Sequence, residues 1–267
     1  MTDHKARLIG NNLYVGYGQT DILKDVTLAI PEGKITVLIG ANACGKSTLL
    51  KSMSRLLKPR SGMVLLDGKS LHHYAPKPLA QVMGILPQTP MAPEGIVVSD
   101  LVARGRFPYQ KRFSGLSVAD LAAVQQAMEL MGIMDIGDKD VAELSGGQRQ
   151  RVWIAMALAQ ETDMLLLDEP TTYLDIAHQV EILDLLASIN KKKATTIVMV
   201  LHDINLAARY ADYIVAVKDG KIVAEGAPKT LITAELMDLV FSLNSLVITD
   251  PVAGTPLVVP ISQQQVN

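Results

Sequence analysis

Short apolar runs, separated by glycine, proline and polar residues, recur along the chain and are typical of β-strands. The predicted strands cover residues 22–30, 34–39, 63–66, 164–167, 195–200 and 213–217. Several runs show no polar alternation, which is typical of strands buried on both faces of a sheet. Residues 46–57 and 118–131 instead have helical spacing. The second of these helices is predicted to bury Leu121, Val124, Met128 and Met131. Strands that alternate with helices predict an α/β fold.

The strand pattern stops between about residues 88 and 144, where helical spacing follows the proline-rich segment 89–93. We therefore expect one domain over residues 1–250, with a helical subdomain at about 89–150 inserted into its α/β core. Residues 251–267 are predicted to form a loose C-terminal tail. The residues behind that prediction are Pro251, Pro256, Pro260, Gln263, Gln264 and Gln265.

Composition narrows the class of protein. The 267 residues carry a formal net charge of −2, which argues against a strongly basic nucleic-acid binder. Cys44 is the single cysteine, so an internal disulfide framework and a multi-cysteine metal site are excluded. No apolar run approaches the roughly 20 residues of a membrane span, and residues 1–7 lack the apolar core of a signal peptide. These features predict a cytoplasmic protein.

A phosphate-binding pattern, G-x-x-x-x-G-K-[ST], lies between the predicted strand 34–39 and the predicted helix 46–57. It consists of Gly40, Ala41, Asn42, Ala43, Cys44, Gly45, Lys46 and Ser47. The glycines let backbone N–H groups turn toward a polyphosphate, and the helix N-terminus adds positive potential. Lys46 is predicted to reach the β- and γ-phosphates, and the Ser47 hydroxyl to bind Mg²⁺. A chance glycine-rich turn is the alternative, which the flanking strand and helix disfavour.

Two carboxylates, Asp168 and Glu169, end the apolar strand 164–167, and α/β sheets bind their ligands at strand tips of this kind. Asp168 is placed to hold Mg²⁺ through water, and Glu169 to polarise an attacking water. Taken alone, such a pair is more often a solvated turn or a helix cap. Beside a phosphate loop, the catalytic interpretation is favoured.

A third motif, Leu-Ser-Gly-Gly-Gln-Arg-Gln over residues 144–150, places a hydroxyl and two glycines at a predicted helix start. It is a second potential anion-binding helix N-terminus. An ordinary helix cap would explain Ser145, Gly146 and Gly147 taken alone. Two such sites are unusual beside a single phosphate loop.

In their order and spacing, these three motifs resemble the nucleotide-binding subunit of an ATP-binding cassette (ABC) transporter. The resemblance covers most of the chain. It implies an α/β P-loop NTPase (RecA-like) core with an N-terminal antiparallel β subdomain and an inserted α-helical subdomain. It also implies ATP, Mg²⁺ and a head-to-tail dimer with a second copy. Each ATP would lie between the phosphate loop of one copy and residues 145–148 of the other, which explains the second anion site.

The resemblance assigns further positions, each with a more ordinary explanation when taken alone. Tyr17 resembles the aromatic residue that stacks on adenine, but could be an ordinary strand-end tyrosine. Gln88 resembles the glutamine that touches Mg²⁺ and the attacking water. His202 resembles the histidine that contacts the γ-phosphate, but could be an exposed loop histidine. Asp175 resembles part of the loop that links the two sites across the dimer, although it could simply cap the following helix.

The implied site is therefore extensive. Its catalytic residues are Glu169, His202 and Gln88, and its metal ligands are Ser47, Gln88 and Asp168. Its nucleotide-contacting residues are Tyr17, Gly40, Ala41, Asn42, Ala43, Cys44, Gly45, Lys46, Ser47, Thr48, Ser145, Gly146, Gly147, Gln148 and Asp175. Relatives often have other residues at Ala41 and Ala43, but these are variable positions, so ATP binding is still expected. Cys44 is either a thiol whose modification blocks ATP or a small tolerated residue.

Residues 102–108, 171–175 and 250–256 resemble bacterial ATPases of ferric-siderophore importers, close to the ferric-enterobactin type. The implied partners are transmembrane permease subunits at the cytoplasmic face of the inner membrane and, indirectly, a periplasmic or lipoprotein substrate-binding protein, without nucleic acid. We expect the permease to dock on residues 88–112. The exposed apolar groups there would include Phe107, Pro108 and Tyr109, although burial in the core is the alternative for Phe107.

Three other functions are alternatives. Vitamin B12 and haem importers share the general architecture, and the transported compound is assigned by resemblance only. A soluble ABC ATPase that acts on ribosomes or DNA usually has tandem cassettes or a very long coiled-coil insertion. Here Lys46 and Ser145 are only 99 positions apart. A non-hydrolysing nucleotide switch is disfavoured because Glu169 and His202 are both present.

Overall fold

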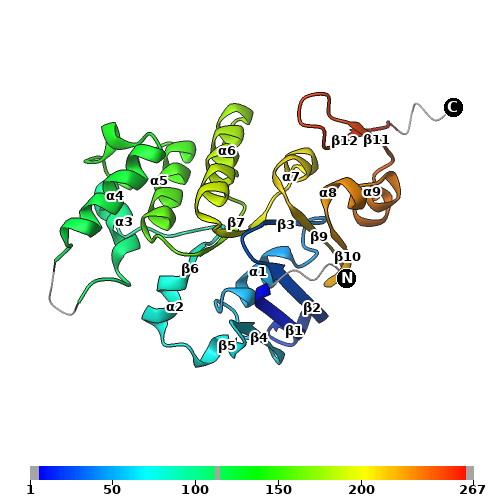
Figure 1. The fold of residues 1–267 in the computed structure, drawn as a ribbon, viewed down its shortest axis with the longest axis horizontal. Helices are drawn as coiled ribbons and strands as arrows, with labels where there is room; N and C mark the ends of the chain where they lie inside the picture. The colour runs from blue at the N-terminus through cyan, green and yellow to red at the C-terminus, as the bar shows by residue number, and fades with distance from the viewer. Residues whose placement is uncertain (1–5, 112–114, 263–267) are drawn as a thin grey trace. The chain divides into compact units, whose positions relative to one another are not determined.

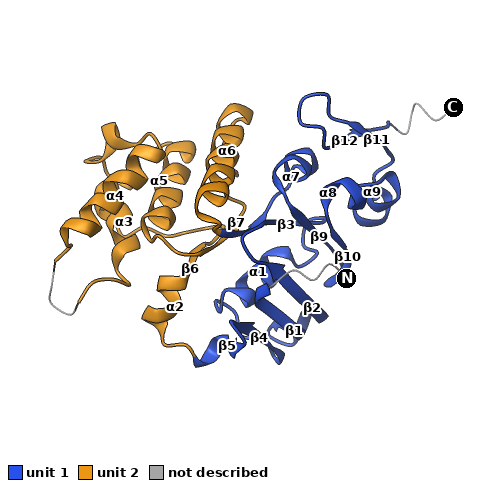
Figure 2. Cartoon of the chain, viewed as in Figure 1, with its two compact units in different colours: residues 1–73, 196–267 blue, residues 74–195 orange. Residues whose placement is uncertain are grey.

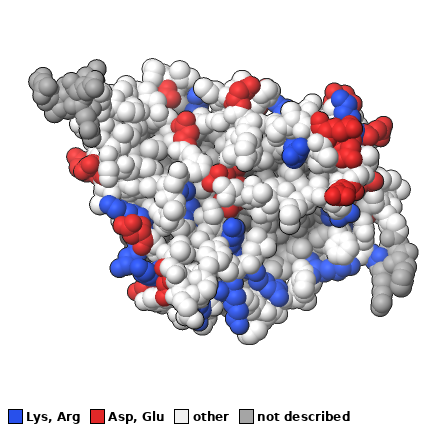
Figure 3. Space-filling view, turned by 180° about the vertical axis from the view of Figure 1, so that it is seen from behind, with Lys and Arg blue, Asp and Glu red and all other residues white. Residues whose placement is uncertain are grey.

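The computed structural model describes residues 6–111 and 115–262. The chain forms two compact units (Figure 2): Met1–His73 with Thr196–Asn267, called unit 1, and Tyr74–Thr195, called unit 2. Within the described residues, no helix is both long and apolar enough to cross a membrane. Both signs of charge occur on the face drawn in Figure 3, in keeping with the net charge of −2.

An antiparallel sheet opens unit 1 (Figure 1), as expected for the N-terminal β subdomain. Its strands are β1 (Ala6–Tyr17), β2 (Thr20–Pro31), β4 (Ser61–Leu66) and β5 (Lys69–Ser70), in the order β2-β1-β4-β5. Buried and exposed residues alternate along most of β2 because one face of this sheet packs on the core. The predicted strands 22–30 and 63–66 lie within β2 and β4.

The second sheet of unit 1 carries the phosphate-loop segment. Strand β3 (Ile35–Ile39) pairs in parallel with both β8 (Thr196–Val200) and β9 (Tyr213–Lys218), and β10 (Lys221–Gly226) pairs antiparallel with β9. Every residue of β3 and β8 is buried, as their mostly apolar sequences predict. The helices of unit 1 are α1 (Lys46–Met53), α7 (Ile204–Tyr210), α8 (Pro228–Leu231) and α9 (Ala234–Phe241), with a 3₁₀ turn η1 (Leu71–His73). Helix α1 ends before the predicted residue 57 because Arg55 adopts a positive φ of 66°.

The predicted loose tail is wrong for residues 256–260, because β11 (Ser245–Thr249) and β12 (Pro256–Pro260) form an antiparallel hairpin. The Asp250 carboxylate closes its turn by accepting hydrogen bonds from the backbone N–H groups of Val252 and Ala253 at 2.8 and 3.2 Å. The Asn205 side-chain amide donates a hydrogen bond to the carbonyl of the buried Val258 and accepts one from its backbone N–H. Local turn chemistry and this long-range anchor outweigh the prolines, while Gln263, Gln264 and Gln265 lie outside the described residues.

Unit 2 contains the predicted helical insert and extends beyond it on both sides. Its helices are α2 (Pro76–Val82), α3 (Val98–Ala103), α4 (Val118–Leu130), α5 (Gly146–Ala159) and α6 (Ile176–Lys193). Its 3₁₀ turns are η2 (Arg104–Arg106), η3 (Met134–Ile136) and η4 (Val141–Glu143). Strand β6 (Met83–Leu86), which the sequence pattern missed, pairs in parallel with β7 (Met164–Asp168).

One residue of the predicted buried face of α4 is wrong. Val124, Met128 and Met131 are buried, but Leu121 is 54% exposed. Asp120 takes the buried position instead, because its carboxylate pairs with the buried Arg106 guanidinium at 2.9 Å. The buried face of α4 therefore keeps the predicted Val124 and Met128 and includes Asp120 in place of Leu121.

Candidate functional site

The phosphate-loop pattern joins β3 to α1, as its sequence context predicts. Residues 41–43 are exposed, whereas 44–46 are buried. Gly45 has a φ of +111°, and a Cβ there would lie 2.7 Å from Leu23 Cδ2. The second glycine of the pattern is therefore required both by its backbone conformation and by the close approach of β2.

The Lys46 side chain is buried inside this loop and contacts its backbone. Its buried ammonium donates hydrogen bonds to the carbonyl oxygens of Gly40 and Ala41 at 2.8 and 2.9 Å, and lies 3.9 Å from the Cys44 sulfur. These carbonyls are neutral, so the contacts hold the loop in shape without neutralising the positive charge. A buried cation at a helix N-terminus fits a polyphosphate group.

A turn far along the chain braces the same loop. Asp219 and Gly220 join β9 to β10 with φ angles of 47° and 76°, as in a type I′ hairpin turn. The Gly220 N–H donates to the Cys44 carbonyl at 3.0 Å, and its own carbonyl accepts from the Lys24 N–H at 3.0 Å. The Asp-Gly dipeptide is a sequence signal for a turn, but the sequence does not show that this turn contacts the phosphate loop.

Two more of the predicted residues belong to unit 1. His202 follows β8, and β8 runs parallel to β3 with Val200 opposite Leu38. His202 and the phosphate loop therefore leave the same edge of the sheet, where α/β folds bind ligands. Tyr17 ends β1 and is 50% exposed.

The two carboxylates predicted for catalysis lie at the end of β7 in unit 2, and both are buried. Glu169 has a φ of 55°, which is unusual for a residue with a side chain, and accepts a hydrogen bond from the Thr172 hydroxyl at 3.1 Å. Backbone strain of this kind is concentrated at functional sites. Because β6 and β7 are parallel with Leu86 opposite Leu167, the exposed Gln88 leaves the same edge as the carboxylates.

Ser145 forms a complete capping box at the start of α5. Its hydroxyl accepts from the Gln148 N–H at 3.2 Å, and the Gln148 side chain accepts from the Ser145 N–H at 3.2 Å. One turn later, the Gln150 amide donates to the Pro170 carbonyl at 2.9 Å. That contact, which sequence reasoning missed, ties α5 to the segment that follows Glu169.

Asp175 caps α6 in this structure, as its more ordinary explanation predicts. Its carboxylate accepts a hydrogen bond from the His178 backbone N–H at 2.9 Å. That hydrogen bond, followed by the charge and hydrogen bond of the His178 side chain, lowers the pKa of Asp175. Capping does not exclude a second role, because a carboxylate oxygen can accept more than one hydrogen bond.

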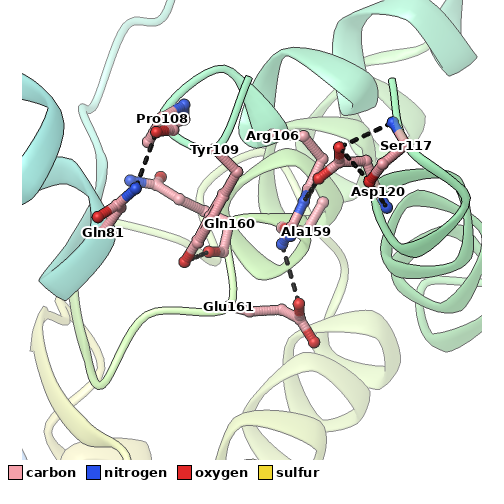
Figure 4. Close-up of polar contacts among 9 residues, drawn as sticks. All are labelled: Gln81, Arg106, Pro108, Tyr109, Ser117, Asp120, Ala159, Gln160 and Glu161. Atoms are coloured by element: carbon pink, nitrogen blue, oxygen red, sulfur yellow. Dashed lines mark hydrogen bonds and ion pairs between the residues drawn. The ribbon is translucent and has the colours of Figure 1, made fainter. Parts of the chain in front are cut away.

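The expected apolar docking segment contains the buried residue Arg106, whose polar contacts are drawn in Figure 4. The Arg106 guanidinium contacts the Asp120 carboxylate, the Ala159 carbonyl and the Glu161 carboxylate at 2.8–2.9 Å. It also lies 4.0 Å from the centre of the Tyr109 ring. Hydrogen bonds from Ser117, followed by one from Arg106, lower the pKa of Asp120 to about 2, so the pair stays charged near neutral pH.

The docking segment itself is only partly exposed. Phe107 is 63% exposed, so the alternative of burial in the core is wrong for it. Pro108 is buried and corrects the expectation of an exposed group there, while Tyr109 is half-buried and donates its hydroxyl to the Gln160 carbonyl at 2.9 Å. Arg112 lies outside the described residues.

The predicted site residues thus fall into two sets. Unit 1 carries Tyr17, Gly40, Ala41, Asn42, Ala43, Cys44, Gly45, Lys46, Ser47, Thr48 and His202. Unit 2 carries Gln88, Ser145, Gly146, Gly147, Gln148, Asp168, Glu169 and Asp175. Within each unit, several of these residues leave a common sheet edge or flank a common helix start.

Comparison with known proteins gives one family. The sequence profile described as "ABC transporter" matches residues 23–172. The chain is 51% identical over 263 residues to the ferric enterobactin transport ATP-binding protein FepC of Escherichia coli K12, covering 98% of this chain and 97% of that protein. It is 55% identical over 248 residues to the probable siderophore transport system ATP-binding protein YusV of Bacillus subtilis, covering 93% and 90%.

Solved structures give the same result. A metal-chelate type ABC transporter in an inward-facing conformation aligns with a TM-score of 0.81 at 26% identity, covering 97% of this chain and 98% of that one. A dimeric bacterial ABC transporter cassette aligns at 0.74 and 28% identity, covering 82% and 98%. The post-hydrolysis state of that cassette, bound to ADP and phosphate, aligns at 0.73 and 27% identity, covering 82% and 98%.

Proposed function

This chain belongs to the ABC transporter family and is an ATPase, and from that premise we propose that it powers the import of a ferric siderophore through separate permease subunits. The observation that carries the proposal is 51% identity over 98% of the chain to a ferric enterobactin transport ATP-binding protein. A catecholate siderophore of that type is the first candidate. The chain would act as a peripheral subunit at the cytoplasmic face of the membrane.

The residues of the phosphate loop suit ATP. The Lys46 ammonium lies at the N-terminus of α1, and the loop around it turns at a glycine that admits no side chain. We assign Lys46 to the β- and γ-phosphates, with backbone N–H groups of residues 41–48 completing the cradle. Tyr17, which is half exposed, is assigned to the adenine ring.

Oxygen donors of the kind that Mg²⁺ prefers are available in both units: the Ser47 hydroxyl, the Gln88 amide and the Asp168 carboxylate. When bound, the ion neutralises charge on the β- and γ-phosphate oxygens. We assign Glu169 to the attacking water, whose proton its carboxylate would accept, and His202 to hydrogen bonding with the γ-phosphate. Positioning and charge stabilisation account for most of the catalysis in such reactions.

We assign residues 145–148 and Asp175 to the ATP held by a second copy. The capping box exposes Ser145 and Gln148 at the start of α5, where backbone N–H groups attract an anion. A solved relative of this fold forms a dimer. In the proposed head-to-tail arrangement, ATP draws the copies together and hydrolysis releases them.

Phe107 is proposed to insert into the permease. Phe107 is 63% exposed and directly follows Arg106, which is buried and paired with the buried Asp120. An aromatic side chain on a rigidly held backbone contributes strongly to binding at an interface, because little conformational entropy is lost when it binds. Arg106 also donates a hydrogen bond to the Ala159 carbonyl at the end of α5. A displacement of Phe107 by the permease would therefore be transmitted to α5, the helix that starts after Ser145.

The Phe107→Ser variant is expected to lower permease-coupled substrate uptake about tenfold, while the ATPase activity of the isolated subunit stays unchanged. Uptake into vesicles and phosphate release by the isolated protein are the two measurements. Leu121→Ser is the matched control, because Leu121 is another exposed apolar residue of unit 2, at 54%. Equal losses in both variants, or unchanged uptake in Phe107→Ser, would contradict the assignment.

Growth on a single iron source tests the transported compound. Deleting the gene is expected to abolish growth on a ferric catecholate siderophore and to leave growth on inorganic iron intact. A defect confined to haem or vitamin B12 utilisation would move the assignment to that importer type. Co-purification with ribosomes, without any uptake defect, would contradict transport altogether.

A further inference from the structure

Arg60 holds the turn that joins β1 to β2. Its guanidinium donates to the Asp21 carboxylate at 2.5 Å and to the Gly18 carbonyl at 2.6 Å. Longer contacts, at 3.4 and 3.5 Å, reach the carbonyls of Thr20 and Gln19. One side chain therefore contacts an acceptor on each residue from 18 to 21.

The backbone of Arg60 is itself fixed to β1. Its N–H donates to the Tyr14 carbonyl at 2.8 Å, at the point where β4 begins beside β1. The guanidinium therefore extends from the residue that immediately precedes β4 of the same sheet, so the turn is held by a residue that lies outside β1 and β2. A planar fork with five donors can satisfy several carbonyls at once, which a lysine ammonium cannot reproduce in the same geometry.

The turn leaves little freedom to the residue before it. Tyr17 pairs with Thr20 across the turn, and a Cβ on Gly16 would lie 1.9 Å from the Thr20 carbonyl oxygen. The backbone of Tyr17 is thus confined on both sides. The residue as a whole is nevertheless 50% exposed, so its side chain gains little support from core packing. The direction of the ring depends mainly on the backbone that carries it.

We propose that Arg60 is a positioning residue for the nucleotide base: by fixing the 18–21 turn, it presents the Tyr17 ring to adenine in a preformed orientation. The inference rests on the proposed stacking role of Tyr17. Ordering a side chain and a turn before binding removes a cost that would otherwise weaken nucleotide affinity. Arg60 does not need to touch the nucleotide, and it takes no part in hydrolysis.

A structural role alone predicts a different result. The Arg60–Asp21 pair is about one-third exposed, and exposed ion pairs contribute little to folding stability. Arg60→Ala is therefore expected to leave the unfolding temperature nearly unchanged. The expected effect is instead a roughly three- to tenfold rise in the KM for ATP, with kcat unchanged.

The test compares four variants of the full-length protein in steady-state ATPase assays. Arg60→Ala and Tyr17→Ala are both expected to raise the KM for ATP, and the double variant is expected to match Tyr17→Ala alone. Arg7→Ala is the matched control, because Arg7 also binds a turn of this sheet, through Asp67 at 2.8 and 3.0 Å, at the opposite end of β1. This control is expected to keep the wild-type KM.

Each contrary outcome has one meaning. An unchanged KM in Arg60→Ala while Tyr17→Ala raises it overturns the role of Arg60 and leaves Tyr17 in place. A double variant whose KM rises by the product of the two single effects also overturns it, because Arg60 would then act independently of Tyr17. An unchanged KM in Tyr17→Ala overturns both assignments, and wild-type protein without ATPase activity contradicts the proposed function itself.

Discussion

Glu169→Gln is expected to lower the rate of ATP hydrolysis by about 10²–10⁴-fold while ATP binding is retained. Glutamine has the shape of glutamate, but its amide cannot take a proton from the attacking water. Because ATP would persist between the two copies, the variant is also expected to accumulate as a dimer. Phosphate release, equilibrium ATP binding and gel filtration with ATP measure the three effects.

The local structure should be unchanged by the substitution Glu169→Gln. Glutamine keeps a carbonyl oxygen that can accept the hydrogen bond from the Thr172 hydroxyl, so the strained backbone at φ 55° retains its side-chain contact. Glu181→Gln is the matched control, since Glu181 is an exposed carboxylate of unit 2 that pairs with Arg151 at 2.6 Å. Hydrolysis at the normal rate in Glu169→Gln would show that Glu169 is not the base.

Lys46→Ala is expected to weaken ATP binding by about a hundredfold. The reason is that the proposed charge-assisted hydrogen bonds from the Lys46 ammonium to the phosphates contribute about 3 kcal/mol in total. Two effects add. The phosphates lose their buried cation, and the carbonyls of Gly40 and Ala41 lose the donor that holds the loop in shape. Titration calorimetry with ATP measures the loss, and thermal unfolding reports on the fold.

Lys51→Ala separates this effect from a general change of charge, because Lys51 lies in the last turn of the same helix α1. It is expected to bind ATP like the wild type. If Lys46→Ala also binds ATP with wild-type affinity, the phosphate-loop assignment is wrong. If both variants lose affinity equally, the effect belongs to the net charge of α1 and not to Lys46.

Structural features that depend on neighbouring residues could be predicted from the sequence, whereas features that depend on distant residues could not. The phosphate loop, the capping box at Ser145 and the cap at Asp175 are local, so short patterns predicted their places on strand ends and helix starts. The fully buried strands β3, β7 and β8 could be predicted equally well, because mostly apolar runs indicate burial without any knowledge of the neighbouring strands.

The errors came from contacts between distant residues. Leu121 was placed in the core because periodicity cannot show that Asp120 pairs with Arg106, a residue from a different element. The tail was expected to be loose because its prolines are visible in the sequence, whereas the anchoring of Val258 by Asn205 is not. In both cases a specific polar partner outweighed the local pattern.

By itself, the sequence determined the fold class and the family and indicated the positions proposed for the chemistry, because glycines, a lysine and carboxylates at fixed spacings are local properties of the chain. Only the tertiary structure decided how those positions are held. Gly220 braces the loop at Cys44, Gln150 ties α5 to Pro170, and Arg60 fixes the turn beside Tyr17. The physical reason is that a hydrogen bond between distant residues forms only where the folded backbone places the donor next to the acceptor. A short sequence pattern does not contain that information.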